Sequence, residues 1–529
     1  MGRITQVTTK QNAAAASVTL ASAIAYQPLS RLVQAMAYGN GLSDFNTHTL
    51  DYELDVLGVY NGATSVINRA HTRADRLNLT NIFDNVAAAN NQVCAYGPAN
   101  RLQNADGPWG KRTFYYDGVG NRTTEIATPP ASTVATTDTL GYAPTNNRVS
   151  QIVRGGSTVR SFTYDGAGNL LTDNGLGGNK TYTYNRRNRL SGATVGALTY
   201  GYTYNAMEQL AIRQATNATP VTTTHFIHDI FGNVIAETAG GGATGATGTV
   251  REYIWLPETE IAPTMASRTQ VDRPLAVVDA VNGASPATWW VSVDHLNRPV
   301  RMTTSTKAAV WDAVWLPWGG VHAITGSASL DARFPGQWFQ LETGLHYNWH
   351  RSYDPTVGRY TQPDPLGFVD GPSVYGYARA APWRFVDRNG RTTYAVVNTN
   401  GYTGHVGVVV VGPSGNALYD PGGSYREDTI GSGQALFGDD VNLSDYVNYQ
   451  RQDGPDVQVI AFATTAAQEK KIIDNIEGRG GCLPGYCAKC SSSVFNNTAP
   501  FFKDLPGYFF PSSFGSLLKR RGGSPVSIP

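Results

Sequence analysis

Residues 162–170 read FTYDGAGNL, and this short stretch carries the pattern that decides the fold. Its two aromatic residues stand at alternate positions, so on a β-strand both side chains point to the same face. Asp165 can bond its own backbone at the start of a turn, and Gly168 supplies the positive φ that such a turn needs. Leu170 then begins the returning strand. The stretch therefore predicts a strand, a tight turn and a second strand.

The same wording returns along the chain. The aromatic pair and the turn behind it appear again twenty residues later in residues 182–190, and twenty residues after that in residues 202–210. Further copies begin at residues 114 and 226, and weaker ones lie at residues 96–102 and 291–298. A repeat of this kind is one supersecondary unit that buries its apolar face only against its neighbours. We therefore expect the units to stack edge to edge into one long sheet.

The composition agrees with a mainly β fold. The 529 residues include 57 glycines and 28 tyrosines, and 15% of them are charged, compared with about 25% in an ordinary soluble chain. These numbers argue against a coiled coil or a helical bundle, and 41% hydrophobic residues suffice for sizeable cores. Because 41 basic residues face 40 acidic ones, there is no global electrostatic footprint for nucleic acid or an anionic membrane.

Residues 12–30 form an uncharged, alanine-rich stretch that superficially resembles the apolar part of a signal peptide. Val18, Leu20 and Ile24 are its only bulky aliphatic residues before Leu29, so we interpret it as a strand segment instead. We expect no clear signal peptide. No uninterrupted apolar run reaches the roughly 18 residues of a membrane helix, so we also expect no transmembrane segment.

Residues 333–390 carry a second succession of short motifs. In order they read RFPGQ, GLHYN, RSYDP, GRY, PDPLG, YGYA and DRNG. The repeats resemble the YD repeats of Rhs-type proteins, and this succession is similar to the Rhs-associated core of the same family. The resemblance implies a polymorphic toxin, in which a hollow β-shell encloses a variable C-terminal toxin domain. It implies a YD-repeat β-shell over residues 1–332, a core over residues 333–390 and a toxin domain over residues 391–529.

The resemblance also implies self-cleavage in the core. In the family, the aspartates of two Asp-Pro-x-Gly motifs cut the chain just behind the second motif. Asp364 stands in an intact copy, whereas Asp387 stands in a copy in which Arg388 replaces the usual proline. Two carboxylates near one peptide bond can divide acid and base roles, because repulsion separates their pKa values. Arg359 is a candidate for positioning or neutralising one of them. The alternative is that both aspartates merely begin turns.

Beyond Gly390 the repeat wording ends and a different pattern begins. Strands are predicted at residues 393–397, 404–411, 417–420 and 456–463, and helices at residues 444–451, at residues 465–477 and from Cys487 onward. This mixture predicts a small α+β domain behind the mainly β shell and core.

A histidine and a cysteine are the candidate catalytic residues of this domain. His405 is the only histidine beyond residue 390, and Cys487 stands at the expected start of a helix. A thiol becomes a nucleophile near neutral pH when a histidine and a helix N-terminus lower its pKa. The order of a strand with His405, a hairpin and a late Cys487 resembles circularly permuted papain-like hydrolases of the NlpC type. The resemblance implies a cysteine peptidase or amidase. Asp420 is the candidate for orienting His405, although Asp before Pro-Gly is also a turn former.

Several alternatives stay open from the sequence. Cys490, one helical turn beyond Cys487, is the alternative nucleophile. Cys482, Cys487, Cys490 and His405 together could hold a structural zinc ion. Cys482 could instead form a local disulfide with Cys487 or Cys490. We rank the thiol nucleophile first, zinc second and the disulfide third, and expect no metal or other cofactor.

The resemblance implies further properties of the whole protein. It implies a secreted or delivered effector from a bacterial cytoplasm that acts in interbacterial competition, with a cognate immunity protein as partner. The substrate is expected to be a peptide, peptidoglycan, a protein side chain or a lipid ester, and no nucleic-acid partner is expected. A non-enzymatic surface or adhesion protein is the main alternative, and a nuclease toxin is a weaker one.

Overall fold

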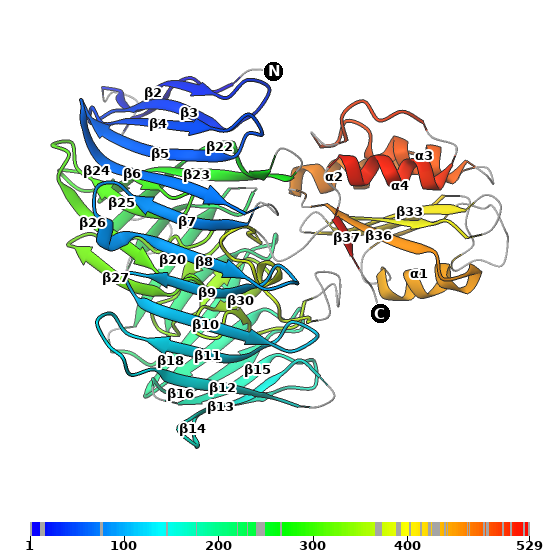
Figure 1. Cartoon of the computed structure of the whole chain (residues 1–529), viewed down its shortest axis with the longest axis horizontal. Helices are drawn as coiled ribbons and strands as arrows, with labels where there is room; N and C mark the ends of the chain where they lie inside the picture. Colours follow the sequence, from blue (N-terminus) through cyan, green and yellow to red (C-terminus); the bar gives the residue numbers. More distant parts are fainter. Residues whose placement is uncertain are drawn as a thin grey trace. The chain divides into compact units, whose positions relative to one another are not determined.

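The protein is described from a computed structural model (Figure 1). It describes residues 3–10, 16–74, 78–143, 146–175, 177–219, 221–229, 231–239, 249–264, 267–364, 373–387, 393–400, 404–412, 415–421, 425, 434–437, 441, 443–462, 464, 466–479, 482, 486–499, 502–507, 510–521 and 524–526. The chain forms two compact units, which are treated separately. The first consists of Met1–Pro363 with Tyr375–Asn389, and the second of Asp364–Val374 with Gly390–Pro529.

The first unit is built on one antiparallel sheet of 27 described strands, in which each strand pairs with its predecessor and its successor in the chain. The strands are, in chain order, β1 (Val7–Thr9), β2 (Val18–Tyr26), β3 (Val33–Tyr38), β4 (Ser43–His48), β5 (Leu54–Asn61), β6 (Thr64–Arg73), β7 (Leu79–Asp84), β8 (Gln92–Tyr96), β9 (Leu102–Gly107), β10 (Gly110–Tyr116), β11 (Arg122–Thr128), β12 (Thr136–Tyr142), β13 (Val149–Arg154), β14 (Ser157–Tyr164), β15 (Leu170–Gly175), β16 (Gly178–Tyr184), β17 (Leu190–Val195), β18 (Leu198–Tyr204), β19 (Leu210–Ala215), β20 (Thr222–His228), β21 (Val234–Ala239), β22 (Thr249–Thr264), β23 (Ser267–Asp279), β24 (Ala287–Val293), β25 (Pro299–Thr303), β26 (Ala309–Trp315) and β27 (Val321–Gly326). The predicted long sheet of stacked repeats is therefore present.

The repeat turn is stabilised by its aspartate. Asp165 accepts hydrogen bonds from the backbone N–H and the side-chain amide of Asn169, at 2.8 and 2.9 Å. Gly168 has a φ of +93°, as the turn between β14 and β15 requires. The first aromatic residue of each copy is buried: Phe162, Tyr182 and Tyr202 are 6%, 2% and 5% exposed. The local pattern thus builds the hairpin that the sequence predicts.

A second aromatic residue joins each repeat to the one before it. Tyr184 donates its hydroxyl hydrogen bond to the carbonyl of Leu170 at 2.9 Å, and Tyr204 donates to the carbonyl of Leu190 at 2.7 Å. The same bond therefore recurs once per repeat. Neighbouring hairpins are held by these side chains as well as by the backbone ladder.

The sheet curves until late strands lie beside early ones, as the blue and green strands in Figure 1 indicate. Trp290 in β24 donates a hydrogen bond to the carbonyl of Leu20 in β2 at 2.9 Å, and Tyr38 in β3 donates to the carbonyl of Val291 at 3.1 Å. These contacts close a wall around an interior.

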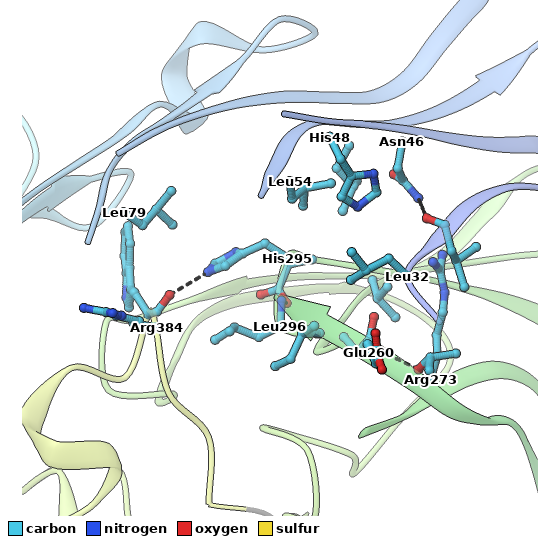
Figure 2. Close-up of a pocket in the computed structure, with 18 of the residues that line it drawn as sticks. Leu32, Asn46, His48, Leu54, Leu79, Glu260, Arg273, His295, Leu296 and Arg384 are labelled. Carbon is cyan, nitrogen blue, oxygen red and sulfur yellow. Dashed lines mark hydrogen bonds between the residues drawn. The ribbon is translucent and has the colours of Figure 1, made fainter. Parts of the chain in front are cut away.

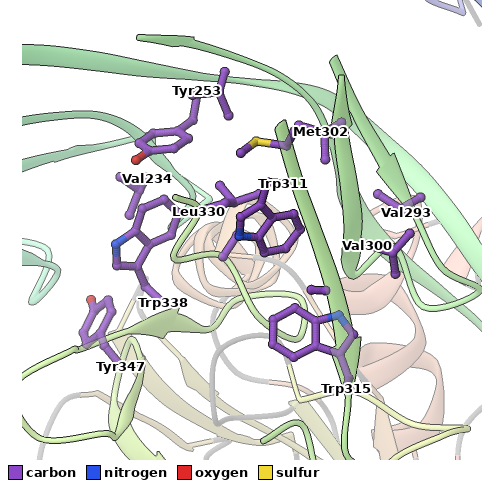
Figure 3. Close-up of a cluster of buried hydrophobic side chains, with 14 of the residues drawn as sticks. Val234, Tyr253, Val293, Val300, Met302, Trp311, Trp315, Leu330, Trp338 and Tyr347 are labelled. Carbon is purple, nitrogen blue, oxygen red and sulfur yellow. The ribbon is translucent and has the colours of Figure 1, made fainter. Parts of the chain in front are cut away.

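Residues of the predicted core fill that interior. They form a small antiparallel sheet of β28 (Trp338–Phe339), β29 (His346–Asn348), β30 (Arg351–Asp354) and β31 (Arg359–Tyr360). Figure 3 shows Trp338 and Tyr347 beside Val234 and Tyr253 of the wall, with Trp311 from β26 close by. The core and the shell therefore pack as one unit.

The second unit is a six-stranded antiparallel sheet covered by helices on both faces (Figure 1). Its strand order is β35 (Gln434–Phe437), β34 (Gly415–Asp420), β33 (His405–Gly412), β32 (Thr393–Asn398), β36 (Val457–Phe462) and β37 (Ser524–Val526). The helices α2 (Ala466–Arg479), α3 (Cys487–Phe495) and α4 (Pro511–Arg520) pack on one face, and α1 (Leu443–Gln450) packs on the other. This is the α+β architecture that the sequence predicts.

Some elements of the second unit differ from the sequence-based expectation. The helix α2 runs to Arg479, two residues beyond the end that the sequence predicts. The helix α4 was not predicted, because Pro511, Gly515 and its serines weaken its helical pattern. Phe514 and Leu518, four residues apart, are fully buried and hold α4 on the sheet. Short 3-10 helices lie at Ala88–Asn90, Ala378–Ala380 and Arg451–Asp453.

Helices of the described residues are all too short or too polar to cross a membrane.

We predict that Asp165→Ala destabilises the first unit by about 1–3 kcal/mol, because it removes the acceptor of the buried Asn169 N–H and one of the two acceptors of the Asn169 side-chain amide, which keeps only Asn188. Urea denaturation followed by tryptophan fluorescence measures this loss. The matched control is Asp138→Ala, which removes a partly exposed ion pair with Arg154 and should cost less than about 1 kcal/mol. Equal effects of the two substitutions would contradict the role assigned to the turn.

Candidate functional site

The candidate site of the second unit lies where two strands and one helix meet. His405 is the first residue of β33, and Asp420 is the last residue of the neighbouring strand β34. Because β33 and β34 are antiparallel, the start of one lies beside the end of the other. Cys487 is the first residue of α3, which packs against β33. The structure thus brings together three of the residues that the sequence singles out.

Asp420 is the buried centre of a hydrogen-bond network. Its Oδ1 accepts from His405 Nε2 at 2.6 Å and from the Tyr446 hydroxyl at 2.6 Å, and its Oδ2 accepts from the Tyr425 N–H at 3.1 Å. Burial raises the pKa of the Asp420 carboxyl, but the bonds from His405, Tyr446 and Tyr425 outweigh burial and leave that pKa below its usual value. The carboxylate is fully buried and stays ionised.

Cys487 is the second partner of His405 in this site. Burial raises the pKa of its thiol. The interaction with His405 and the backbone hydrogen bonds from Val406 and Ala488 lower that pKa by more than burial raises it, so the net shift is downward. In its thiol form Cys487 contacts the Gly404 carbonyl at 3.9 Å. The Cys487 thiolate is therefore stabilised by one side chain and by the start of a helix.

His405 connects these two groups. Burial lowers its pKa, but the bonds to Asp420 and Cys487 more than compensate and raise that pKa to about 10. Between the lowered pKa of Cys487 and pH 10, the stable form of the pair is a thiolate beside an imidazolium. This is the charge state of an activated cysteine nucleophile.

Local packing fixes the start of α3. Ser491 donates from its hydroxyl to the carbonyl of Val406 at 2.8 Å, which ties the helix to β33 one turn beyond Cys487. The cap residue Tyr486 provides no side-chain hydrogen bond to the helix among the described residues.

Gly404 and Gly407 make room around His405. Gly404 has a φ of +61°, and a Cβ there would lie 2.6 Å from the Asn398 carbonyl and 3.2 Å from Pro511. A Cβ at Gly407 would overlap the hydroxyl of Tyr446. The two small residues on either side of His405 are thus required by the approach of neighbouring groups.

The remaining cysteines correct two expectations. Cys482 and Cys490 form a disulfide, with their Cα atoms 6.6 Å apart. Cys490 is therefore no free thiol in this structure and does not serve as the alternative nucleophile. The same bond removes two of the four ligands of the zinc alternative, and the disulfide that ranked third is the arrangement present. Cys487 and Cys94 are the free thiols.

The aspartates of the core lie in different units. Asp387, in the first unit, accepts hydrogen bonds from Arg351 at 2.9 Å and from the Tyr360 hydroxyl at 2.8 Å. Asp364 groups with the second unit, is 6% exposed and donates its backbone N–H to the Val374 carbonyl at 2.7 Å.

Arg359 takes a different place from the one expected. Its guanidinium donates to the Asn147 carbonyl at 2.5 Å and lies over the rings of Tyr142 and Tyr375. Among the described residues, Arg351 therefore supplies the cationic contact to Asp387 that the sequence suggested for Arg359. The predicted cut beyond Asp387, near residues 390–392, lies outside the described residues.

The first unit contains a small cavity of about 50 Å³ (Figure 2). Its lining includes His48, His295, Arg73, Arg384 and Glu260. Burial lowers the pKa values of His48 and His295 to about 4, so both histidines are neutral near pH 7. None of the sequence-predicted site residues lines this cavity.

Tyr446 is the functional residue that the sequence did not reveal. It lies in α1, fully buried, and reaches Asp420 across the sheet from a segment with no recognisable motif. Its ring packs edge-on against Tyr425 at 5.1 Å. The sequence signal that could have pointed to Tyr446 was Gly407, two residues beyond His405, since a glycine inside a strand often marks the close approach of another group.

Comparisons with known proteins give relatives for parts of the chain. No protein-family model matches it. It is 26% identical to double-stranded DNA deaminase toxin A of Burkholderia cenocepacia over 50% of this chain and 21% of that protein. Toxin protein Tse5 of Pseudomonas aeruginosa is 37% identical over 18% of this chain and 7% of its own length. "Probable deoxyribonuclease RhsA" of Dickeya dadantii is 35% identical over 20% of this chain and 7% of its own length. The chain spans about a fifth of the first relative and less of the others, and these relatives are toxins and Rhs proteins.

Solved structures share the fold. The crystal structure of TcdB2-TccC3-TEV matches with a TM-score of 0.55 and 14% identity over 71% of this chain and 19% of that chain. The Photorhabdus luminescens Tc holotoxin pore matches with a TM-score of 0.57 and 14% identity over the same shares. The second unit is too small to supply such a share, so the likeness lies largely in the first unit. It shows a mainly β, shell-like fold.

We predict that Tyr446→Phe slows alkylation of Cys487 at pH 6.5 about threefold to tenfold. The substitution removes one of three hydrogen bonds to the buried Asp420 carboxylate and so weakens its hold on His405. Mass spectrometry of the Cys487 peptide after timed exposure to iodoacetamide measures the rate. Tyr449→Phe is the matched control, because it removes a hydroxyl from the same helix and keeps the ring that packs on Tyr425. An unchanged rate in Tyr446→Phe would remove Tyr446 from the network.

Proposed function

We propose that the second unit is a cysteine hydrolase in which Cys487 attacks a carbonyl carbon, His405 carries the proton and Asp420 orients His405. The observation that carries the proposal is the placement of Cys487, the first residue of α3, beside His405, whose Nε2 donates to the buried Asp420 carboxylate. The lowered pKa of the thiol and the raised pKa of the imidazole both follow from that contact.

The geometry supports acyl transfer in two steps. The Cys487 thiolate forms a C–S bond to the carbonyl carbon, and the carbonyl oxygen gains negative charge near the N–H groups at the start of α3. The His405 imidazolium gives its proton to the leaving amine or alcohol as the old bond breaks. His405 then takes a proton from water, which attacks the thioester, releases the acid and restores the thiolate.

We propose an amide or ester as the substrate class, in a peptide, peptidoglycan, a protein side chain or a lipid. The order of His405 and Cys487 in this unit resembles that of permuted papain-like hydrolases of the NlpC type. The toxin names of the relatives support the wider proposal that the whole protein is an Rhs-type polymorphic toxin, delivered as an effector and neutralised in its producer by an immunity protein.

We also propose that the core cuts the chain behind Asp387. The carboxylate of Asp387 is held by Arg351 and Tyr360, so it is oriented by groups of the first unit and available as a base or an acid partner. Asp364 is the proposed second carboxylate. We propose that Arg351, in place of Arg359, positions the carboxylate of Asp387.

The first test concerns the thiol. In the full-length protein at pH 6.5, iodoacetamide should label Cys487 at least about tenfold faster than Cys94, whose pKa burial raises well above its usual value. The labelling rate of Cys487 should rise with pH through an apparent pKa below that of an ordinary cysteine thiol. His405→Ala should slow Cys487 about tenfold or more and leave Cys94 unchanged, since it removes the hydrogen bond and charge that lower the thiol pKa.

Growth of bacteria that produce the chain behind an added export signal, so that it reaches the oxidising periplasm, separates this proposal from the alternatives. Cys487→Ala should relieve growth inhibition, whereas Cys94→Ala should not. Inhibition that persists in Cys487→Ala together with DNA damage would favour a DNA-directed activity, as in the names of two relatives. Cysteine labelling that is uniformly slow and indifferent to His405 would refute the cysteine hydrolase.

The second test concerns the core. If Asp387 takes part in cleavage, the purified protein should run on a denaturing gel as fragments of roughly 390 and 139 residues, the lengths that the core boundary in the sequence gives. Asp387→Asn should give one full-length band, because an amide cannot exchange the proton. Arg359→Gln is the control that should still cleave. A single band for the unmodified chain would show that Arg388 has abolished the reaction.

A further inference from the structure

The disulfide of the second unit lies one helical turn from the proposed nucleophile. Cys490 is the fourth residue of α3, and its N–H donates to the Tyr486 carbonyl at 2.9 Å to close the first turn of that helix. Cys482 lies in the segment between α2 and α3, eight residues earlier. The bond therefore ties the first turn of α3 to the segment that leads into it.

We infer that the Cys482–Cys490 disulfide is a redox switch for Cys487, which is reactive when the disulfide is formed and quiet when it is reduced. The inference rests on the proposed function of Cys487. It concerns the control of that site and the compartment in which the substrate is met.

The nine-residue helix α3 is held by its packing on the sheet and by the Ser491 bond to Val406, and the disulfide adds the covalent tie between its first turn and Cys482. No described side chain caps it at Tyr486. The two backbone N–H groups and the His405 contact that stabilise the Cys487 thiolate all require this turn to be formed in place. Opening the disulfide frees the segment that enters the turn and so loosens the position of Cys487.

The two sulfur atoms have unequal surroundings. Cys490 is 3% exposed, whereas Cys482 is only half-buried and lies with Tyr486 and Lys489 along an open groove between α2 and α3. A thiolate from solvent therefore reaches the Cys482 sulfur. Arg479 lies with its guanidinium 3.3 Å from the Cys490 sulfur. A thiolate that departs from Cys490 would form beside this cation, which favours the bond's opening in that direction.

The exchange balances with a dithiol as the reductant. One thiolate of the dithiol attacks Cys482, forms a mixed disulfide and expels the Cys490 thiolate, which takes up a proton. The second thiolate of the dithiol then attacks the mixed disulfide and frees Cys482. The protein gains two electrons and two protons, and the dithiol becomes a disulfide. A disulfide oxidant reverses the reaction.

The switch matches the two surroundings of a toxin. Disulfides are reduced in a bacterial cytoplasm and persist in the periplasm and outside the cell. The domain would be quiet where it is made and become reactive in an oxidising compartment. Its substrate is then an amide or ester that is exposed outside the cytoplasm.

The test uses the full-length protein equilibrated with dithiothreitol or with oxidised glutathione. After each treatment, iodoacetamide at pH 6.5 is added, and mass spectrometry follows the peptides of Cys487, Cys482 and Cys490. We expect reduction to lower the labelling rate of Cys487 at least about tenfold, and we expect reoxidation to restore that rate. Cys94→Ser is the matched control and should respond as the unmodified protein does. Cys482→Ser combined with Cys490→Ser should give the slow rate under both conditions.

Arg479→Gln examines the direction of opening. It should slow the reduction of the disulfide severalfold and leave the Cys487 rate of the oxidised protein unchanged. If the double serine variant loses its near-ultraviolet circular dichroism, the redox series on the unmodified protein decides. Equal Cys487 rates in the reduced and oxidised protein would overturn the switch. If Cys487 is labelled rapidly and His405→Ala leaves its labelling rate unchanged, the proposed hydrolase is overturned instead, so the two failures are distinguishable.

Discussion

A lone β-hairpin leaves both edges of its backbone unpaired and one apolar face uncovered, and the first unit is arranged to satisfy both needs. Pairing in chain order from β1 to β27 covers the edges. The contact of Trp290 with Leu20 curves the sheet into a wall, and Trp338 with Tyr347 fills the inside. The core segment therefore supplies the buried partner that the repeats lack, and the wall in turn covers the core.

Local patterns made the fold of the repeats predictable. Phe162, Asp165 and Gly168 each act within their own hairpin, so their spacing is sufficient to predict it. The bond from Tyr184 to Leu170 is longer in range, and the repeat pattern identified the tyrosine but not the carbonyl that it bonds. The helix α4 was missed because its stability comes from Phe514 and Leu518 against the sheet, while its own residues favour a helix weakly.

The sequence predicted which residues make up most of the candidate site, but it did not predict all of the contacts between them. His405 and Cys487 stand out because few other side chains of the second unit can take their roles, and the structure places Asp420 beside His405. Tyr446 reaches the site from the far face of the sheet, which no spacing reveals. Spacing also cannot choose among three cysteines: Cys482 lies five residues from Cys487 and eight from Cys490, and packing selects the second pairing. Arg351 and Arg359 were likewise indistinguishable until their neighbours were known.

The chain-order pairing of the strands has a genetic consequence. Because β16 contacts β15 and β17 in the same register as β18 contacts β17 and β19, one hairpin can be replaced by a duplicate of its neighbour without changing the backbone register on either side. Duplication or deletion of a gene segment that encodes one twenty-residue repeat would therefore preserve the strand pairing of the wall. An unequal exchange of an odd number of residues would turn Tyr182 and its successors to the wrong face. The number of repeats that such genes encode can therefore change in steps of one repeat.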